Sequence, residues 1–225
     1  MKNIKKNINL VIASIVFTFI AAQAYAGSGY GRTMLRVTIK NLTRGQIFSP
    51  PLVVSHDKNF QLFETGEPAT DDLARLAEDG DSSGLIDMVQ NNPHVMDYTT
   101  SEGPVLPGES VTIDVPANLR FNRISLAGML VTTNDGFVAV RGESIPFGNR
   151  KTTFYAQAYD AGSEANSEEC AYIPGPPCGN GGVHDTADAE GYVHIHGGIH
   201  GIGDLLPERD DWKNPVAEIT LEYIQ

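Results

Sequence analysis

Along much of the chain, apolar and polar residues alternate with a period of two, which is the pattern of half-buried β-strands. The alternation is strictest at residues 35–39, 111–115 and 217–223, and a longer apolar run at 124–132 is typical of a central strand covered on both faces. Further strands are expected, separated by turn sequences, at 137–140, 153–159 and 192–196. Many short strands joined by turns predict an antiparallel β-sandwich in a mainly all-β fold.

One connecting segment has a helical period instead. Residues 70–77 place three apolar side chains on one face and have two acids, Asp71 and Asp72, near the N-terminal end, and Gly80 follows as a stop signal. A second short helix is expected at 85–90, with Ser82 or Ser83 as its N-cap. One or two short helices are therefore expected to pack over an edge or end of the sandwich.

The first 26 residues have the composition of a secretory signal peptide. Three lysines precede an apolar stretch at 8–22, and Ala24-Tyr25-Ala26 supplies a cleavage pattern before Gly27. The alternative, an uncleaved membrane anchor, is less favoured because the apolar stretch is short for a span. We expect a mature single domain at 27–225 that carries no transmembrane segment and is secreted or periplasmic.

The chain is acidic, with 16 Lys and Arg against 28 Asp and Glu and a net charge of −12. The expected leader contains three of the lysines and no acid, so the remaining 199 residues carry −15. Binding to nucleic acid or to an anionic membrane needs a positive face, so this charge argues against both. It is compatible with cation binding, and also with acidity that only keeps a secreted protein soluble.

Two cysteines, Cys170 and Cys178, flank a segment rich in proline and glycine that cannot be a helix or a central strand. In an oxidising compartment they are expected to pair, as a local clamp on this loop. A redox pair or a metal dithiol is less favoured, because the spacing is not Cys-x-x-Cys and the chain has no third thiol.

Several short motifs occur in a characteristic order. They are Asn41-Leu42-Thr43, Phe48-Ser49-Pro50-Pro51, Ala77-Glu78-Asp79-Gly80, Thr133-Asn134-Asp135-Gly136-Phe137, Tyr159-Asp160-Ala161-Gly162-Ser163-Glu164, the His- and Gly-rich stretch 193–204, and Trp212-Lys213-Asn214-Pro215-Val216-Ala217. Across nearly the whole mature chain this order resembles the spondin N-terminal domain, found in F-spondin, mindin and many bacterial secreted proteins. The resemblance implies a C2-like sandwich. Nothing indicates the thrombospondin repeats or reeler domain of the animal proteins.

The resemblance also implies a calcium site. Its ligands would be Asp135, Asp160 and Glu164, the last a glutamate where the animal proteins have aspartate. Hard oxygen donors in turns suit Ca²⁺, and Gly162 can adopt the positive φ that a tight cation loop needs. Backbone carbonyls and water would complete the coordination. The alternative is that these are ordinary turn acids.

A second group of candidate ligands consists of His194, His196 and His200. The first two are two apart on an expected strand and so point to one face, and the third follows after two glycines. Three imidazoles suit Zn²⁺ or copper. The alternative is buried, hydrogen-bonded histidines around a glycine-rich bend. Transition-metal binding in the periplasm or at the cell surface is therefore the second functional hypothesis.

No motif of an enzyme active site stands out. The chain has no Gly-x-Ser-x-Gly elbow, phosphate loop or dinucleotide fingerprint. The acid pairs Asp71-Asp72 and Glu168-Glu169 are expected to be solvated on the surface. We therefore expect a non-catalytic secreted module for binding or adhesion. Resemblance to mindin implies a protein, a glycan or a lipopolysaccharide as partner.

Overall fold

The computed structural model describes residues 33–146, 148 and 151–224, so the expected leader and its cleavage site lie outside the described residues. Short strands joined by loops make up most of this part of the chain. Its elements are β1 (Thr33–Asn41), β2 (Leu52–His56), α1 (Asp71–Asp79), α2 (Ser83–Gln90), β3 (Val95–Thr100), β4 (Ser110–Ala117), β5 (Arg123–Met129), β6 (Gly136–Ser144), β7 (Thr152–Asp160), the 3-10 turn Cys170–Tyr172, β8 (His194–Ile195), α3 (Pro207–Asp210) and β9 (Ala217–Ile224).

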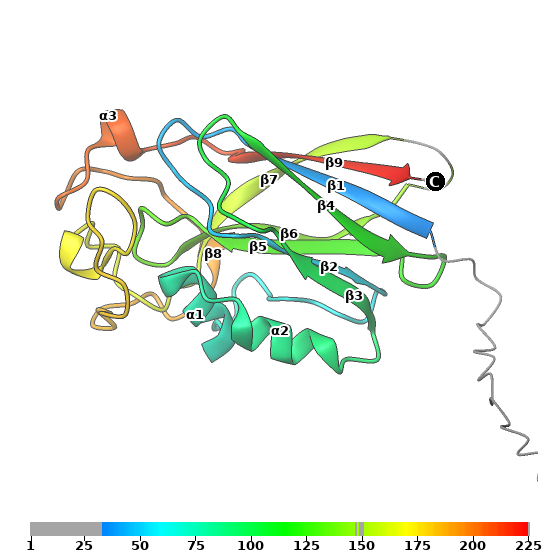
Figure 1. Ribbon diagram of the computed structural model, residues 1–225. Helices are drawn as coiled ribbons and strands as arrows, with labels where there is room; N and C mark the ends of the chain where they lie inside the picture. The colour runs from blue at the N-terminus through cyan, green and yellow to red at the C-terminus, as the bar shows by residue number, and fades with distance from the viewer. Residues whose placement is uncertain (1–32, 147, 149–150, 225) are drawn as a thin grey trace, which may run out of the picture.

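The strands form one antiparallel path, β3-β2-β5-β6-β7-β9-β1-β4, which folds into two facing layers (Figure 1). Strand β7 belongs to both layers: residues 157–160 pair with β6, and residues 152–156 pair with β9. The short β8 pairs with the end of β7. This arrangement confirms the predicted antiparallel sandwich.

The core between the layers follows the alternation in the sequence. On β1, Leu35, Val37 and Ile39 are fully buried, whereas the residues between them are less buried. They face the other layer, which contributes Leu126 and Val138 to the same cluster. Burying each such side chain stabilises the fold by about 1.5–3 kcal/mol, so the strand register places the apolar face inward.

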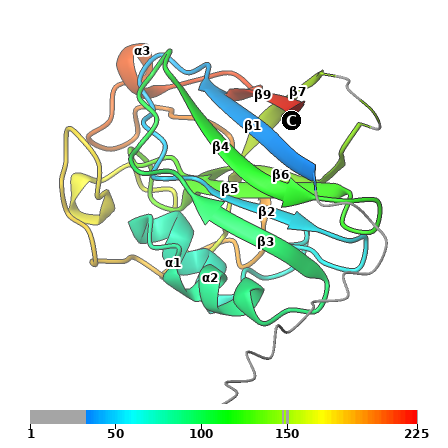
Figure 2. The ribbon, with the colours of Figure 1, turned by 45° about the vertical axis from the view of Figure 1, so that its right-hand side comes forward.

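A second core lies on the outer face of the β2–β5–β6 layer, where α1 and α2 pack (Figures 1 and 2). The side chain of Thr70 caps the start of α1 by accepting a hydrogen bond from the Leu73 amide at 3.2 Å. Gly80 ends it at φ 71°. Both helices were predicted, but at an edge or end of the sandwich. They cover a face instead, because apolar residues on that side of the layer, such as Ala127 and Phe137, must also be buried.

Three features of the fold differ from the sequence-based expectation. Strands β2 and β3 were not predicted, and β8 has two residues where a strand at 192–196 was expected. A short helix, α3, precedes the Trp212 motif.

The predicted pairing of Cys170 with Cys178 is confirmed by a disulfide. No helix among the described residues is long and apolar enough to cross a membrane.

Candidate metal centre

The two acidic turns meet at the end of the sandwich that lies away from the C-terminus (Figure 1). Asp135 comes directly before β6, and Asp160 is the last residue of β7. The antiparallel register pairs Gly136 with Asp160, and the Ala161 amide donates to the Asp135 carbonyl at 3.2 Å. Side chains 25 positions apart in the sequence are thereby brought to one place.

Backbone amides orient both aspartates. Asp135 Oδ2 accepts hydrogen bonds from the amides of Ser163 at 2.8 Å and Glu164 at 3.1 Å. Asp160 Oδ1 accepts from the Gly162 amide at 2.7 Å, and its Oδ2 accepts from the Asn166 side chain at 2.6 Å. The carboxylates are thus held by the turn that follows β7.

Gly162 has the conformation predicted for it. Its φ is +66°, and a Cβ atom at this position would lie 2.3 Å from the Tyr192 carbonyl oxygen. Only glycine meets both requirements, because other residues rarely adopt this φ and any side chain would overlap the neighbouring backbone. The loop between Asp160 and Glu164 therefore depends on this residue.

Glu164 enters the same region from the other side of the turn. Its Oε1 accepts a hydrogen bond from the Asp185 amide at 2.9 Å and lies 3.2 Å from His184 Nδ1. The His184 ring also contacts two acids at the end of α1, Glu78 at 3.4 Å and Asp79 at 3.4 Å. The Ala77–Gly80 motif is thus connected to the acidic turns through this histidine.

The three carboxyl groups are fully buried. Burial raises the pKa of Asp135 to about 7, with a further contribution from Asp160. Burial also raises the pKa of Asp160. It raises that of Glu164 to about 8, and nearby acids, Glu78 first, add to the effect. Negative charge is unfavourable here unless a cation balances it.

Two buried oxygens of this group have no hydrogen-bond partner, Asp135 Oδ1 and Glu164 Oε2. Buried polar atoms are nearly always paired, so these acceptors call for a ligand. Carboxylate oxygens on turns, with backbone carbonyls nearby, are the donor set that Ca²⁺ takes. The chemistry of these donors therefore suits Ca²⁺, for which Asp135, Asp160 and Glu164 are the candidate ligands.

The tightest group of metal-ligand side chains in the described residues is a different one. Ligand atoms of Asp160, Glu190 and His194 all lie within 4.8 Å of one another, whereas Asp135, Asp160 and Glu164 do not form a group of this tightness. Glu190 also accepts a hydrogen bond from Asn166 at 3.0 Å. Asp160 therefore belongs to two overlapping sets of donors. Neither Glu190 nor Asn166 was a sequence-based candidate, because the spacing of these residues gives no metal motif.

The three candidate histidines lie in different surroundings. His194 Nε2 is 3.5 Å from Asp160 Oδ1. His196 Nε2 lies 4.0 Å from Asp160 Oδ2, but its ring is buried against Trp212, and burial lowers its pKa to about 4. The side chain of His200 is 64% exposed and lies beside Glu168. The structure thus brings two of them to Asp160 and leaves His200 outside.

The expectation that Glu168 is solvated is wrong. This residue is buried, and its carboxylate accepts hydrogen bonds from the amides of His200, Gly201 and Ile202. The glycine-rich stretch has many backbone amides and few side chains that could accept hydrogen bonds from them. This could have indicated that a carboxylate elsewhere in the chain accepts these bonds. Its neighbour Glu169 is exposed, as expected.

The Trp212 motif contacts the residues and the strand next to the site. Trp212 packs on His196 with ring centroids 4.9 Å apart. Asn214 Oδ1 accepts from the Ala158 amide at 2.8 Å, at the point where β7 passes from one layer to the other. The motif therefore fixes the end of the strand that carries Asp160.

Comparison with known proteins gives a match to one family. The family model Spondin_N matches residues 40–171, a range that contains Asp135, Asp160 and Glu164 but none of the three candidate histidines. No curated protein matches the chain. The family and the disulfide indicate an extracellular module. With more than half of its length matched, the chain belongs to the spondin N-terminal domain family.

Proposed function

We propose that this protein is a secreted or periplasmic, non-catalytic module that binds Ca²⁺ through Asp135, Asp160 and Glu164. The observation that carries the proposal is the pair of unpartnered oxygens, Asp135 Oδ1 and Glu164 Oε2, within a group of fully buried carboxyl groups. Three converging negative charges are unfavourable alone and favourable around a divalent cation.

Each residue of the site has a separate task in this proposal. The amides of Ser163 and Glu164 orient Asp135, the Gly162 amide orients Asp160, and the Asp185 amide orients Glu164. Calcium supplies the positive charge that these groups lack. Because the carboxylates meet only in the folded chain, ion binding is coupled to the order of the loops.

The ordered loops would form the binding surface of the module. The segment between β7 and β9 has little regular structure and lies at the calcium end (Figure 1). Long loops on a rigid sandwich are common positions for recognition. Family membership supports an extracellular partner, which we propose to be a protein, a glycan or a lipopolysaccharide. The net charge of −12 disfavours nucleic acid.

Thermal unfolding of Glu164→Gln tests the calcium proposal. Gln keeps the acceptor that the Asp185 amide uses and removes the charge. In chelator, the variant should be at least as stable as the wild type, because a buried acid is gone. In millimolar Ca²⁺, the wild type should gain several degrees in melting temperature and the variant much less.

Asp71→Asn is the matched control, since it removes one negative charge from an exposed position in the first turn of α1. This variant should keep the full calcium shift. A wild-type melting temperature that is the same in calcium and in chelator, with no calcium in the purified protein, would show that the proposal is wrong.

A transition-metal site is the second candidate function, and the cluster of Asp160, Glu190 and His194 favours it. Carboxylate and imidazole donors together suit Zn²⁺ or copper better than Ca²⁺. His194→Gln should then abolish zinc or copper uptake, measured by metal analysis, and leave the calcium shift in place. Equal zinc uptake by wild type and variant would exclude this site.

A further inference from the structure

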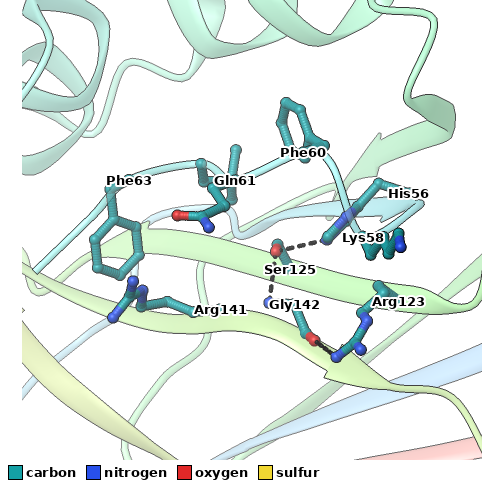
Figure 3. Close-up of a pocket in the computed structure, with 10 residues that line it drawn as sticks. His56, Lys58, Phe60, Gln61, Phe63, Arg123, Ser125, Arg141 and Gly142 are labelled. Atoms are coloured by element: carbon teal, nitrogen blue, oxygen red, sulfur yellow. Dashed lines mark hydrogen bonds between the residues drawn. The ribbon is translucent and has the colours of Figure 1, made fainter.

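A cavity of about 360 Å³ lies at the other end of the β5–β6 layer, beneath the segment that follows β2 (Figure 3). Gly142, on its lining, is six residues along β6 from Gly136, which places it roughly 20 Å from the acidic turns. The cavity is therefore separate from the proposed calcium site.

The floor of the cavity, formed by His56, Ser125 and Gly142, is polar but uncharged. His56 Nδ1 lies 2.7 Å from the Asp57 carbonyl and so donates to it, which leaves Nε2 to accept from the Ser125 hydroxyl at 2.8 Å. The Gly142 amide donates to the same hydroxyl at 2.9 Å. Burial lowers the pKa of His56, which keeps the ring neutral.

This hydroxyl links the three strands that form the base of the cavity. Ser125 is fully buried, and both His56 and Gly142 already bond to its oxygen. The register shift of β5 against β6 places the Gly142 amide there, with Gly142 at φ +62°. The floor is therefore a rigid support, and the chemistry of the cavity depends on the side chains around it.

Three cations line the cavity: Lys58 and Arg123 lie together at one end, and Arg141 lies at the other end beside Phe63 (Figure 3). Arg141 donates to the Thr65 hydroxyl at 2.9 Å and lies over the Phe63 ring, and Arg123 donates to the Gly142 carbonyl at 2.9 Å. None of the three forms an ion pair with a carboxylate of the described residues.

This concentration of positive charge is unusual for the molecule. Three arginines elsewhere lie beside acids, Arg36 with Asp114 at 2.9 Å, Arg209 with Asp210 at 2.7 Å and Arg120 with Asp57 at 3.7 Å, whereas Arg44 and Arg75 have no such ion pair among the described residues. On a chain with a net charge of −12, acids are plentiful, yet none from the described part pairs with the cations of the cavity. An anion from solution is the partner that they lack.

The walls leave room for an organic body as well as a charge. Phe60 and Phe63 line the cavity from the segment above β5 and β6 (Figure 3), and Leu62 lines it as well. A second hollow of about 320 Å³ adjoins it and shares Lys58 and Arg123. Apolar walls with a few polar groups, at this volume, are typical of small-molecule sites.

We propose that this cavity binds a small organic anion, with its carboxylate or phosphate group held by Lys58 and Arg123, its body against Phe60 and Phe63, and a polar group at its far end held by Arg141. Guanidinium groups bind either oxyanion through paired, charge-assisted hydrogen bonds. The acidity of the whole molecule does not prevent this, because charges farther than about 8 Å are screened at physiological salt.

Isothermal titration of the full chain with three matched sugars tests the proposal: glucuronate, glucose 6-phosphate and neutral glucose. One or both charged sugars should bind and glucose should not, and the tighter of the two identifies the oxyanion. Lys58→Gln and Arg141→Gln change exposed side chains, so the fold should persist. Each should weaken binding about tenfold, as expected for loss of one charge-assisted hydrogen bond.

Lys40→Gln is the control, because it removes the same charge from an exposed position on β1, outside the cavity. It should bind as the wild type does. The proposal is overturned if neither charged sugar binds at millimolar concentration, if glucose binds equally, or if Lys40→Gln weakens binding as much as Lys58→Gln. Titration in chelator should give the same affinities, so failure of the calcium site leaves this test intact.

Discussion

At the residue scale, His196 is a buried part of the core beside the site. Its ring packs on Trp212, and its Nδ1 accepts from the Gly198 amide at 3.0 Å. Its Nε2 has no hydrogen-bond partner and lies 4.0 Å from Asp160 Oδ2. A neutral, buried imidazole in this position stabilises the bend of the glycine-rich stretch whether or not a metal is bound.

Replacing His196 with alanine should therefore destabilise the fold. The change removes a buried ring and leaves a cavity beside Trp212, so we expect a loss of about 2–4 kcal/mol in the free energy of unfolding. The loss should be the same in calcium and in chelator. His200→Ala, at an exposed position, should change stability by no more than about 0.5 kcal/mol. Urea unfolding of both variants measures these losses. A His196→Ala protein that is as stable as the wild type but loses bound metal would contradict the structural role of His196.

The sequence predicted the candidate site unevenly. Asp135 and Asp160 became candidates because turn residues and a resemblance mark them, and the register of β6 with β7 brings them together. Glu190 was not found, because it lies in an irregular loop whose path depends on tertiary contacts. Glu168 was misjudged, since its burial results from amides more than thirty positions away. Local patterns do not encode such partners.

At the element scale, the turn after β7 is the most constrained part of the site. Gly162 combines a positive φ with a close approach to the backbone of Tyr192. Gly108, in the turn before β4, also has a positive φ, of 79°, but nothing lies within 4 Å of the position of a Cβ atom. A comparison of substitutions at these two positions therefore separates the effect of backbone strain from the effect of steric overlap.

Gly162→Ala should consequently be much more destabilising than Gly108→Ala. Strain alone costs about 1–2 kcal/mol for a residue in the left-handed region, and this is the loss expected at Gly108. At Gly162 the added methyl group would also displace the Tyr192 backbone, so the loss should be larger and calcium binding should weaken. Urea unfolding and calcium titration measure both effects. Equal losses at the two positions would mean that the β7 turn adapts easily.

The strands show which patterns the sequence carries clearly. Strands β1, β4 and β9 were predicted because one face of each is buried and the period of two is regular. Strand β2 is buried along its whole length, so its sequence lacks alternation. It also follows two prolines, which favour a turn or loop. Strand β3 is partly exposed throughout, because it ends the path of strands. Their pairing depends on neighbours distant in sequence.

At the scale of the whole molecule, export and oxidation belong together. The disulfide between Cys170 and Cys178 is expected to form in an oxidising compartment, and the expected leader would direct the chain to such a compartment. Intact mass spectrometry of the exported protein should show a chain that begins at Gly27 and lacks two thiol hydrogens. Detection of the complete chain with free thiols would contradict both the leader and its cleavage site.

The buried acids also give the metal-free molecule a characteristic response to pH. The pKa of Asp135 rises from 3.8 to about 7 on folding, and that of Glu164 from 4.5 to about 8. Between these limits the folded state holds more protons than the unfolded state, so the acids make stability fall as pH rises. The pKa of His196 is lowered from 6.5 to about 4, and that of His56 is also lowered. These histidines act in the opposite direction, but only below about pH 6.5, where the unfolded chain binds their protons.

The acids therefore act alone above that pH. In chelator, the melting temperature should fall between pH 6.5 and about pH 8.5 as Asp135 and Glu164 are forced to ionise in a buried site. In saturating calcium the fall should be much smaller, because the ion binds the ionised carboxylates. Glu164→Gln in chelator should show a shallower fall than the wild type, since one of the two groups is gone. Thermal unfolding across this pH range, with and without calcium, measures all three. A metal-free melting temperature that stays constant from pH 6.5 to 8.5 would mean that water or another cation already balances these charges.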